Sequence, residues 1–145
     1  MTAALLQLLW AFLATLGFAV LFRAPVRDLP LAALAGALAW GSYLGARVAT
    51  GSESLSFFLA SIVVGLFAES MAALLKRPAT LFIISAIIPL VPGAGMYHTM
   101  FEAVSGNPQA SAAAGFQTLT LAGAIAGGLA VAASIARILW LKKPR

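Results

Sequence analysis

The residues best suited to chemistry in this chain form a proline and glycine interruption inside a long apolar run. Residues 78–97 read PATLFIISAIIPLVPGAGMY, with Pro89, Pro92, Gly93 and Gly95 near the middle. Each proline lacks the N–H that would bond the carbonyl four residues earlier, and its ring clashes with the preceding helical turn. Polar backbone is therefore freed inside an apolar segment. In hydrocarbon such a group costs several kcal/mol unless protein, water or a solute satisfies it.

This interruption predicts a solute site made largely of backbone. The expected acceptors are the carbonyls of Ser85 and Ile88, and the expected donors are the amides of Gly93, Ala94 and Gly95. A helix start attracts anions through its unpaired N–H groups and its dipole, which suits a carboxylate. At about 1.5 Å per residue, Pro89 lies roughly 15 Å from Ala79, near the middle of a bilayer core about 30 Å thick. Together with Pro89 and Pro92, these residues form the predicted substrate site. The alternative is a packing kink satisfied by neighbouring hydroxyl groups.

Three titratable side chains near this interruption are candidates for coupling or gating. Glu69 is the acidic residue that lies well inside a predicted span, seven positions before Lys76. An ionised carboxylate is costly in that setting, so its protonation could be linked to solute passage. The alternative is a structural acid that snorkels to the membrane surface or pairs with Lys76, Arg77 or a cation of another subunit. Tyr97 and His98 follow the interruption and could gate a path or relay protons, or could simply be hydrogen-bonded.

Composition places these residues in an integral membrane protein. The chain is 62% hydrophobic and 9% charged, whereas an ordinary soluble domain has about 25% charged residues. We predict an all-α, polytopic fold with one transmembrane domain over residues 1–145, whose fourth helix is broken at Pro89 and Pro92. The five expected helices are residues 3–22, 30–49, 55–75, 79–100 and 112–141. The first run has no basic residue before it and exceeds a signal-peptide core, so we expect it to be a mature helix.

Basic residues predict the orientation of this domain. Most of them fall on one side of a five-helix arrangement: Arg23, Arg27, Lys76, Arg77, Arg137, Lys142, Lys143 and Arg145. Only Arg47 falls near the other side. The positive-inside rule then puts the N-terminus outside and the C-terminus in the cytoplasm, in the inner membrane of the cell. Because these charges mark helix ends rather than one continuous face, they do not indicate a nucleic-acid partner.

Several other kinds of chemistry find no support in the sequence. The chain has no cysteine and a single histidine, which leaves no set of ligands for a metal. No nucleophile–base pair or phosphate-binding loop is recognisable, so we expect neither an enzyme nor a cofactor. Glycines four apart, Gly41 with Gly45 and Gly123 with Gly127, predict close helix packing instead.

Three segments of the chain resemble the threonine/serine exporter family. They are residues 17–25 (GFAVLFRAP), residues 65–69 (GLFAE) and the interrupted run, with PATLF at its start and IIPLVPGAGMY at its end. The length is similar to that of the small, separately encoded YjjB-like subunit, which corresponds to the C-terminal half of fused ten-helix exporters. The resemblance implies a partner subunit with about five helices and a cytoplasmic N-terminal part.

These observations predict one subunit of a secondary transporter that exports threonine, serine or a related small carboxylate, coupled to protons. Its expected partners are the second five-helix subunit, the lipid bilayer and a small solute, and a homo-oligomer stays open. A related possibility keeps this architecture for succinate-like dicarboxylates. A different class is a noncatalytic membrane scaffold that orients a partner protein. An odd number of helices fits the inverted-repeat plan, in which a second five-helix unit runs in the opposite sense.

Overall fold

The computed structural model describes residues 2–141, and this part of the chain is helical throughout, apart from short turns. The elements are α1 (Thr2–Leu21), α2 (Leu29–Thr50), α3 (Glu53–Leu75), α4 (Ala79–Ala86), the 3-10 turn η1 (Ile88–Leu90), α5 (Gly93–Val104) and α6 (Pro108–Leu141). Among the described residues, α1, α2, α3 and α6 are each long and apolar enough to cross a membrane. A fifth span consists of α4 and η1 followed by α5, which is bent from them by 56°. The predicted all-α membrane fold with a broken fourth helix is confirmed.

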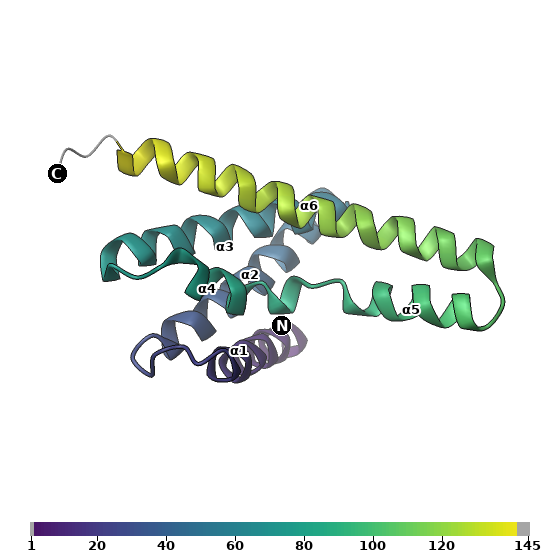
Figure 1. The fold of residues 1–145 in the computed structure, drawn as a ribbon, viewed down its shortest axis with the longest axis horizontal. Helices are drawn as coiled ribbons and strands as arrows, with labels where there is room; N and C mark the ends of the chain where they lie inside the picture. Colours follow the sequence, from purple (N-terminus) through teal and green to yellow (C-terminus); the bar gives the residue numbers. More distant parts are fainter. Residues whose placement is uncertain (1, 142–145) are drawn as a thin grey trace.

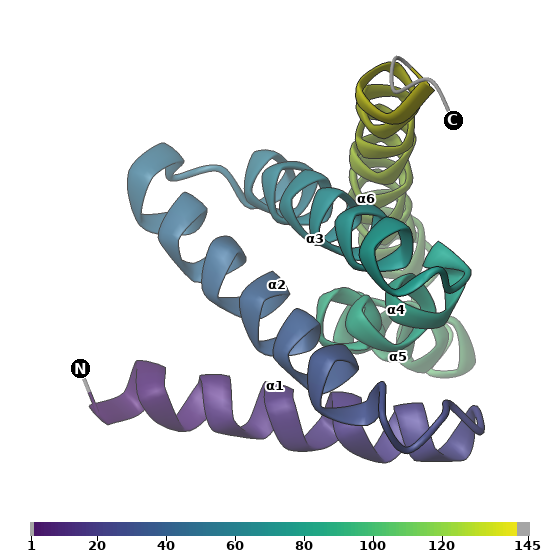
Figure 2. The same cartoon turned by 90° about the vertical axis from the view of Figure 1, so that its left-hand side faces the viewer.

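The helices do not form a simple parallel bundle. In Figure 1, α3 and α6 are seen along their lengths and α1 nearly end-on, whereas Figure 2 shows α1 lengthwise and α6 end-on. Helix α2 lies between these directions and contacts both α1 and α3. Helix α5 packs against the N-terminal half of α6 and extends away from the other helices (Figure 1).

Helix ends follow from local sequence. Gly51, in the left-handed conformation with φ 66°, ends α2 and donates its N–H to the Arg47 carbonyl. Ser52 then begins α3, because its side chain accepts a hydrogen bond from the Leu55 N–H. Gly106, with φ 77°, provides the turn between α5 and α6. Pro108 fits the first position of α6 because its missing N–H would have had no partner there.

Two predicted helix bounds are therefore wrong. The fourth run continues to Val104 rather than ending near residue 100, and the fifth begins at Pro108 rather than near residue 112. Only residues 105–107 lie between the two helices. The polar residues of this region indicated a longer loop, but several of them belong to the last turn of α5 or the first turn of α6. Lys142, Lys143 and Arg145, which contributed to the predicted orientation, lie outside the described residues.

The closest packing joins α3 and α6 through small residues. A Cβ added at Gly128 would lie 2.5 Å from the carbonyl oxygen of Phe58, and one added at Gly65 would lie 2.5 Å from the Cβ of Ala132. The two helices therefore run in the same direction with their backbones close together. Gly123, by contrast, would place a Cβ with nothing within 4 Å. The close approach of the two helices is thus made at Gly128 rather than at the predicted pair of Gly123 and Gly127.

The broken span passes through the centre of the molecule. Leu90 of η1 is fully buried and belongs to a cluster with Ala39 of α2 and Val64 of α3. Those two residues lie near the middle of their helices. The break between α4 and α5, residues 87–92, is therefore at half the height of α2 and α3.

Candidate functional site

The backbone of the break turns twice within six residues. The Ile88 carbonyl accepts a hydrogen bond from the Val91 N–H at 3.2 Å, which closes the 3-10 turn. Pro92, with φ −77° and ψ 57°, has the geometry of an inverse γ-turn. Gly93 accordingly donates its N–H to the Val91 carbonyl at 2.7 Å. Two of the expected binding groups, the Ile88 carbonyl and the Gly93 amide, are thus already engaged within the chain.

Two amides at the start of α5 keep their capacity to donate. The N–H groups of Ala94 and Gly95 are among the first of this helix, which have no intrahelical acceptor. Among the described residues, no hydrogen bond from either group is found. Ala94 is exposed, whereas Gly95 packs closely enough on α6 that a Cβ would lie 2.4 Å from the Thr118 hydroxyl oxygen. Of three predicted donors, two remain available to a ligand.

Ser85 contributes less than expected. Its side chain is almost fully buried and its hydroxyl lies 3.5 Å from the Leu81 carbonyl of the same helix. Its own carbonyl is approached by the Ile87 N–H at the end of α4. A serine bonded back to its helix has little left to offer a solute.

Three of the predicted substrate residues line three different cavities rather than one. The groove beside Pro92 has a volume of about 420 Å³ and is almost entirely apolar; its lining includes Val91, Met96 and Leu119. Pro89 lies on another cavity, of about 280 Å³, between α1 and α2. Ser85 lines a third, of about 470 Å³. In this chain alone, therefore, the break is accessible but is not enclosed in a polar chamber.

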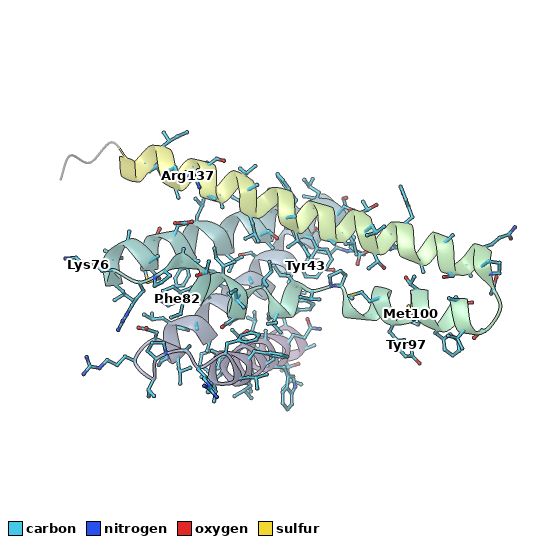
Figure 3. The ribbon with its side chains drawn as sticks, in the orientation of Figure 1. Tyr43, Lys76, Phe82, Tyr97, Met100 and Arg137 are labelled. Atoms are coloured by element: carbon cyan, nitrogen blue, oxygen red, sulfur yellow. The ribbon has the colours of Figure 1, made fainter. Side chains whose placement is uncertain are left out.

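Tyr97 and His98 lie on the exposed surface of α5. Figure 3 shows Tyr97 and Met100 on α5, far along the molecule from Lys76 and Arg137. The Tyr97 ring is 65% exposed, stacks on Phe101 at 6.0 Å between centroids and meets the His98 ring edge-on at 5.6 Å. Neither side chain hydrogen-bonds to another part of the described chain. Any gating role of Tyr97 or His98 would need interacting groups from outside the described part of the chain.

Glu69 lies in a separate cavity at the basic end of the molecule. This basic-end cavity has a volume of about 400 Å³ and is lined by Glu69, Ala72, Ala73, Arg77, Ala79, Ala136 and Arg137. It lies between α3, the start of α4 and the C-terminal part of α6. Within residues 2–141, Glu69 has no basic nitrogen within 4.0 Å, so the alternative of a pairing with Lys76 or Arg77 is not formed.

Arg77 instead faces a different acid. Its Nε lies 3.4 Å from Oδ2 of Asp28, at the start of α2, and the Asp28 side chain is only 6% exposed. The distance is that of an ion pair, but the N–H is not directed at Oδ2, which has no hydrogen-bond donor in the described chain. The pair joins the α1–α2 and α3–α4 turns. The positive end of the α2 dipole also stabilises the carboxylate.

Comparison with known proteins identifies the family. Residues 7–135 match the family described as Threonine/Serine exporter, ThrE. The chain belongs to the threonine/serine exporter family. No solved structure matches it. The predicted resemblance is thereby confirmed, and this exporter-family chain is a membrane protein of a transport family.

Two features of this exporter-family chain escaped the sequence analysis. Asp28 was given no role from the sequence, although it is buried beside Arg77. Arg137 was interpreted only as an orientation signal, although it shares a cavity with Glu69. A signal for the second did exist. Glu69 and Arg137 lie six and four residues before the ends of α3 and α6, so parallel helices bring them to similar heights.

Proposed function

We propose that this chain is one subunit of a secondary exporter that moves threonine, serine or a related small carboxylate out of the cell, coupled to protons. Membership of the family supplies the class of protein. The observation that supports a site is the pair of free amides of Ala94 and Gly95, at the start of α5 and near half the height of the membrane helices. A carboxylate is the ligand such a helix start favours.

The proposed binding surface follows the break. Gly93 is exposed, and a Cβ there would have nothing within 4 Å, so the backbone is open to a solute. Pro89 and Pro92 keep the chain from closing into a continuous helix. The second carbonyl lone pairs of Ser85 and Ile88 are the acceptors left to the site, since each oxygen can accept twice.

A partner subunit would complete this site. None of the residues of α5 is buried, and the apolar groove beside Pro92 opens to the outside of the chain. We propose that a second subunit of about five helices, with a cytoplasmic N-terminal part, covers α5 and encloses the break. Polar groups from that subunit would then face the two free amides.

The proposed orientation places the basic end in the cytoplasm. Arg77 contacts Asp28 of the α1–α2 turn and shares a cavity with Arg137. Arg23 lines a cavity with Pro78 from the α3–α4 turn. At the opposite end, Arg47 is paired with Glu53 at 3.8 Å. By the positive-inside rule, the end that carries more Lys and Arg residues is the cytoplasmic one.

Proton coupling is assigned to Glu69 as part of the same proposal. Its carboxylate is half-buried beside the basic-end cavity, where loss or gain of a proton changes the local charge balance. Glu69→Gln should remove the dependence of export on the proton gradient while leaving assembly with the partner unchanged. A Glu69→Gln complex that responds to the gradient like the wild type would exclude this role.

The transport activity is tested with the complete complex. The chain is co-purified with its partner subunit and reconstituted in liposomes, and the movement of radiolabelled threonine, serine and succinate is measured. We expect threonine and serine to be carried, whereas preferential movement of succinate would indicate a dicarboxylate exporter. Failure of an assembled complex to move any of the three would refute the proposed activity and favour a scaffold.

The break is tested with leucine variants of two glycines at which an added Cβ would meet nothing within 4 Å. Gly93→Leu fills the open backbone surface, whereas Gly45→Leu places the same side chain on α2, where a Cβ also meets nothing within 4 Å. We expect at least about a tenfold loss of transport for Gly93→Leu, equivalent to about 1.4 kcal/mol, and little change for Gly45→Leu. Normal transport by an assembled Gly93→Leu complex would remove the break from the substrate path.

A further inference from the structure

The basic-end cavity contains an acid and a base that form no ion pair with each other at 4.0 Å or less. Glu69 of α3 and Arg137 of α6 both line it, and within the described chain neither forms an ion pair at 4.0 Å or less. Arg77 also lines the cavity, but its charge is balanced by Asp28 at 3.4 Å. The groups left for a ligand are thus one carboxylate and one guanidinium.

This charge arrangement selects one class of ligand. A simple anion would be attracted by Arg137 but repelled by Glu69. A simple cation would be attracted by Glu69 but repelled by Arg137. A dicarboxylate needs two cations, and Arg77 is already engaged by Asp28. A molecule with an ammonium group and a carboxylate on one carbon satisfies both free groups, since Glu69 accepts from the ammonium and Arg137 donates to the carboxylate.

The rest of the cavity fits a small amino acid. Its volume of about 400 Å³ lies within the range of about 300–1,000 Å³ found for small-molecule sites. The other lining residues are alanines, of which Ala72 and Ala136 are buried. Their methyl groups leave room for a short side chain.

We propose that the basic-end cavity binds the zwitterion of a small α-amino acid, held by Glu69 at its ammonium group and by Arg137 at its carboxylate. This inference rests on the proposed function and adds a second cargo site, distinct from the break. Ile125, which lines the groove beside the break, and Ala136, which lines the basic-end cavity, are about 16 Å apart along α6. On the proposed orientation this second site faces the cytoplasm, where cargo enters.

The site also explains how a proton and cargo would exclude each other. Glu69 is the acceptor for the ammonium group, so a protonated Glu69 has no charge to offer it. The charged groups around it are Arg137 from α6 and Arg77 from the α3–α4 turn, the latter balanced by Asp28 of α2. Binding of the amino acid and uptake of a proton therefore compete for one carboxylate.

The test measures binding by the assembled complex in nanodiscs of phosphatidylglycerol, a lipid without an ammonium group that could occupy the cavity itself. Displacement of radiolabelled threonine is measured with threonine, threonine methyl ester and 2,3-dihydroxybutanoate. The ester lacks the carboxylate, and the hydroxy acid lacks the ammonium group. We expect Arg137→Gln to weaken threonine about tenfold or more without affecting the ester, and Glu69→Gln to weaken threonine without affecting the hydroxy acid.

Arg47→Gln, at the opposite end of the molecule, is the matched control and should leave all three affinities unchanged. Equal weakening of all three ligands by Glu69→Gln and Arg137→Gln, or no change in any of them, overturns this assignment. That result is distinguishable from failure of the proposed function, in which the wild-type complex moves no cargo.

Discussion

One methyl group tests the contact that shapes the basic-end cavity. In Gly128→Ala, the new Cβ would lie 2.5 Å from the Phe58 carbonyl oxygen and 2.8 Å from the Cβ of Ser61. Non-bonded heavy atoms pack at about 3.5–4.0 Å, so this methyl group is about 1 Å too close to α3. A backbone oxygen inside a helix cannot rotate aside. Helix α6 must therefore move away from α3.

The expected cost follows from that displacement. A gap of about 0.5–1 Å forfeits roughly a quarter to a half of the attraction between the atoms that separate, and overpacking of this kind costs about 1–3 kcal/mol. Gly123→Ala is the matched control, because it makes the same change on the same helix with nothing within 4 Å of the new Cβ. Replacing an interior helical glycine with alanine favours the helix by roughly 0.5–1 kcal/mol. The two variants should thus change the stability in opposite directions.

The measurement is equilibrium unfolding of the purified chain in mixed micelles, followed by far-ultraviolet circular dichroism as the fraction of dodecyl sulfate rises. We expect the midpoint to fall for Gly128→Ala and to stay level or rise for Gly123→Ala. The reasoning is refuted if both variants have equal midpoints, because the α3–α6 contact would then not depend on the missing side chain at Gly128.

Two other predictions concern the charged ends. Arg77→Ala leaves the buried Asp28 carboxylate without its cation, which should destabilise the fold by about 1–3 kcal/mol. Arg47→Ala should cost less than about 1 kcal/mol, because its acidic partner is 37% exposed; equal losses in thermal or detergent unfolding would contradict the distinction. Since the chain has no cysteine, Asn107→Cys should react with an impermeant maleimide on intact cells and Val26→Cys only after permeabilisation. The reverse pattern would invert the proposed orientation.

The sequence predicts the class of fold because that depends on local features. Apolar runs bounded by basic residues are sufficient to locate the spans, and Pro89 and Pro92 are sufficient to locate the break, since proline acts on its own helix. The helix ends between the fourth and fifth spans were harder to predict. Pro108 can follow a loop or begin a helix, and only the turn at Gly106 decides between these roles.

Features that depend on contacts between helices were not predictable in the same way. The spacing of Gly123 and Gly127 matches a packing motif, but the rotation of α6 places Gly128 against α3 instead. Asp28 looks like a solvated turn residue until Arg77 from another turn covers it. The use of the Gly93 amide depends on the backbone angles of Pro92, which bring the Val91 carbonyl within 2.7 Å of that nitrogen. The single chain also leaves the candidate site at the break open.

The length of α6 has a mechanical consequence. This helix runs from Pro108 to Leu141 without an interior proline, a rise of about 50 Å. Its first half holds α5 through contacts such as Gly115 with Thr99, and its second half holds α3 through Gly128. Because the same helix contacts both regions, a tilt of α6 about its contact with α3 that moves α5 outward would move Arg137 in the opposite direction. A rigid-body tilt of α6 would therefore move both ends of this molecule together.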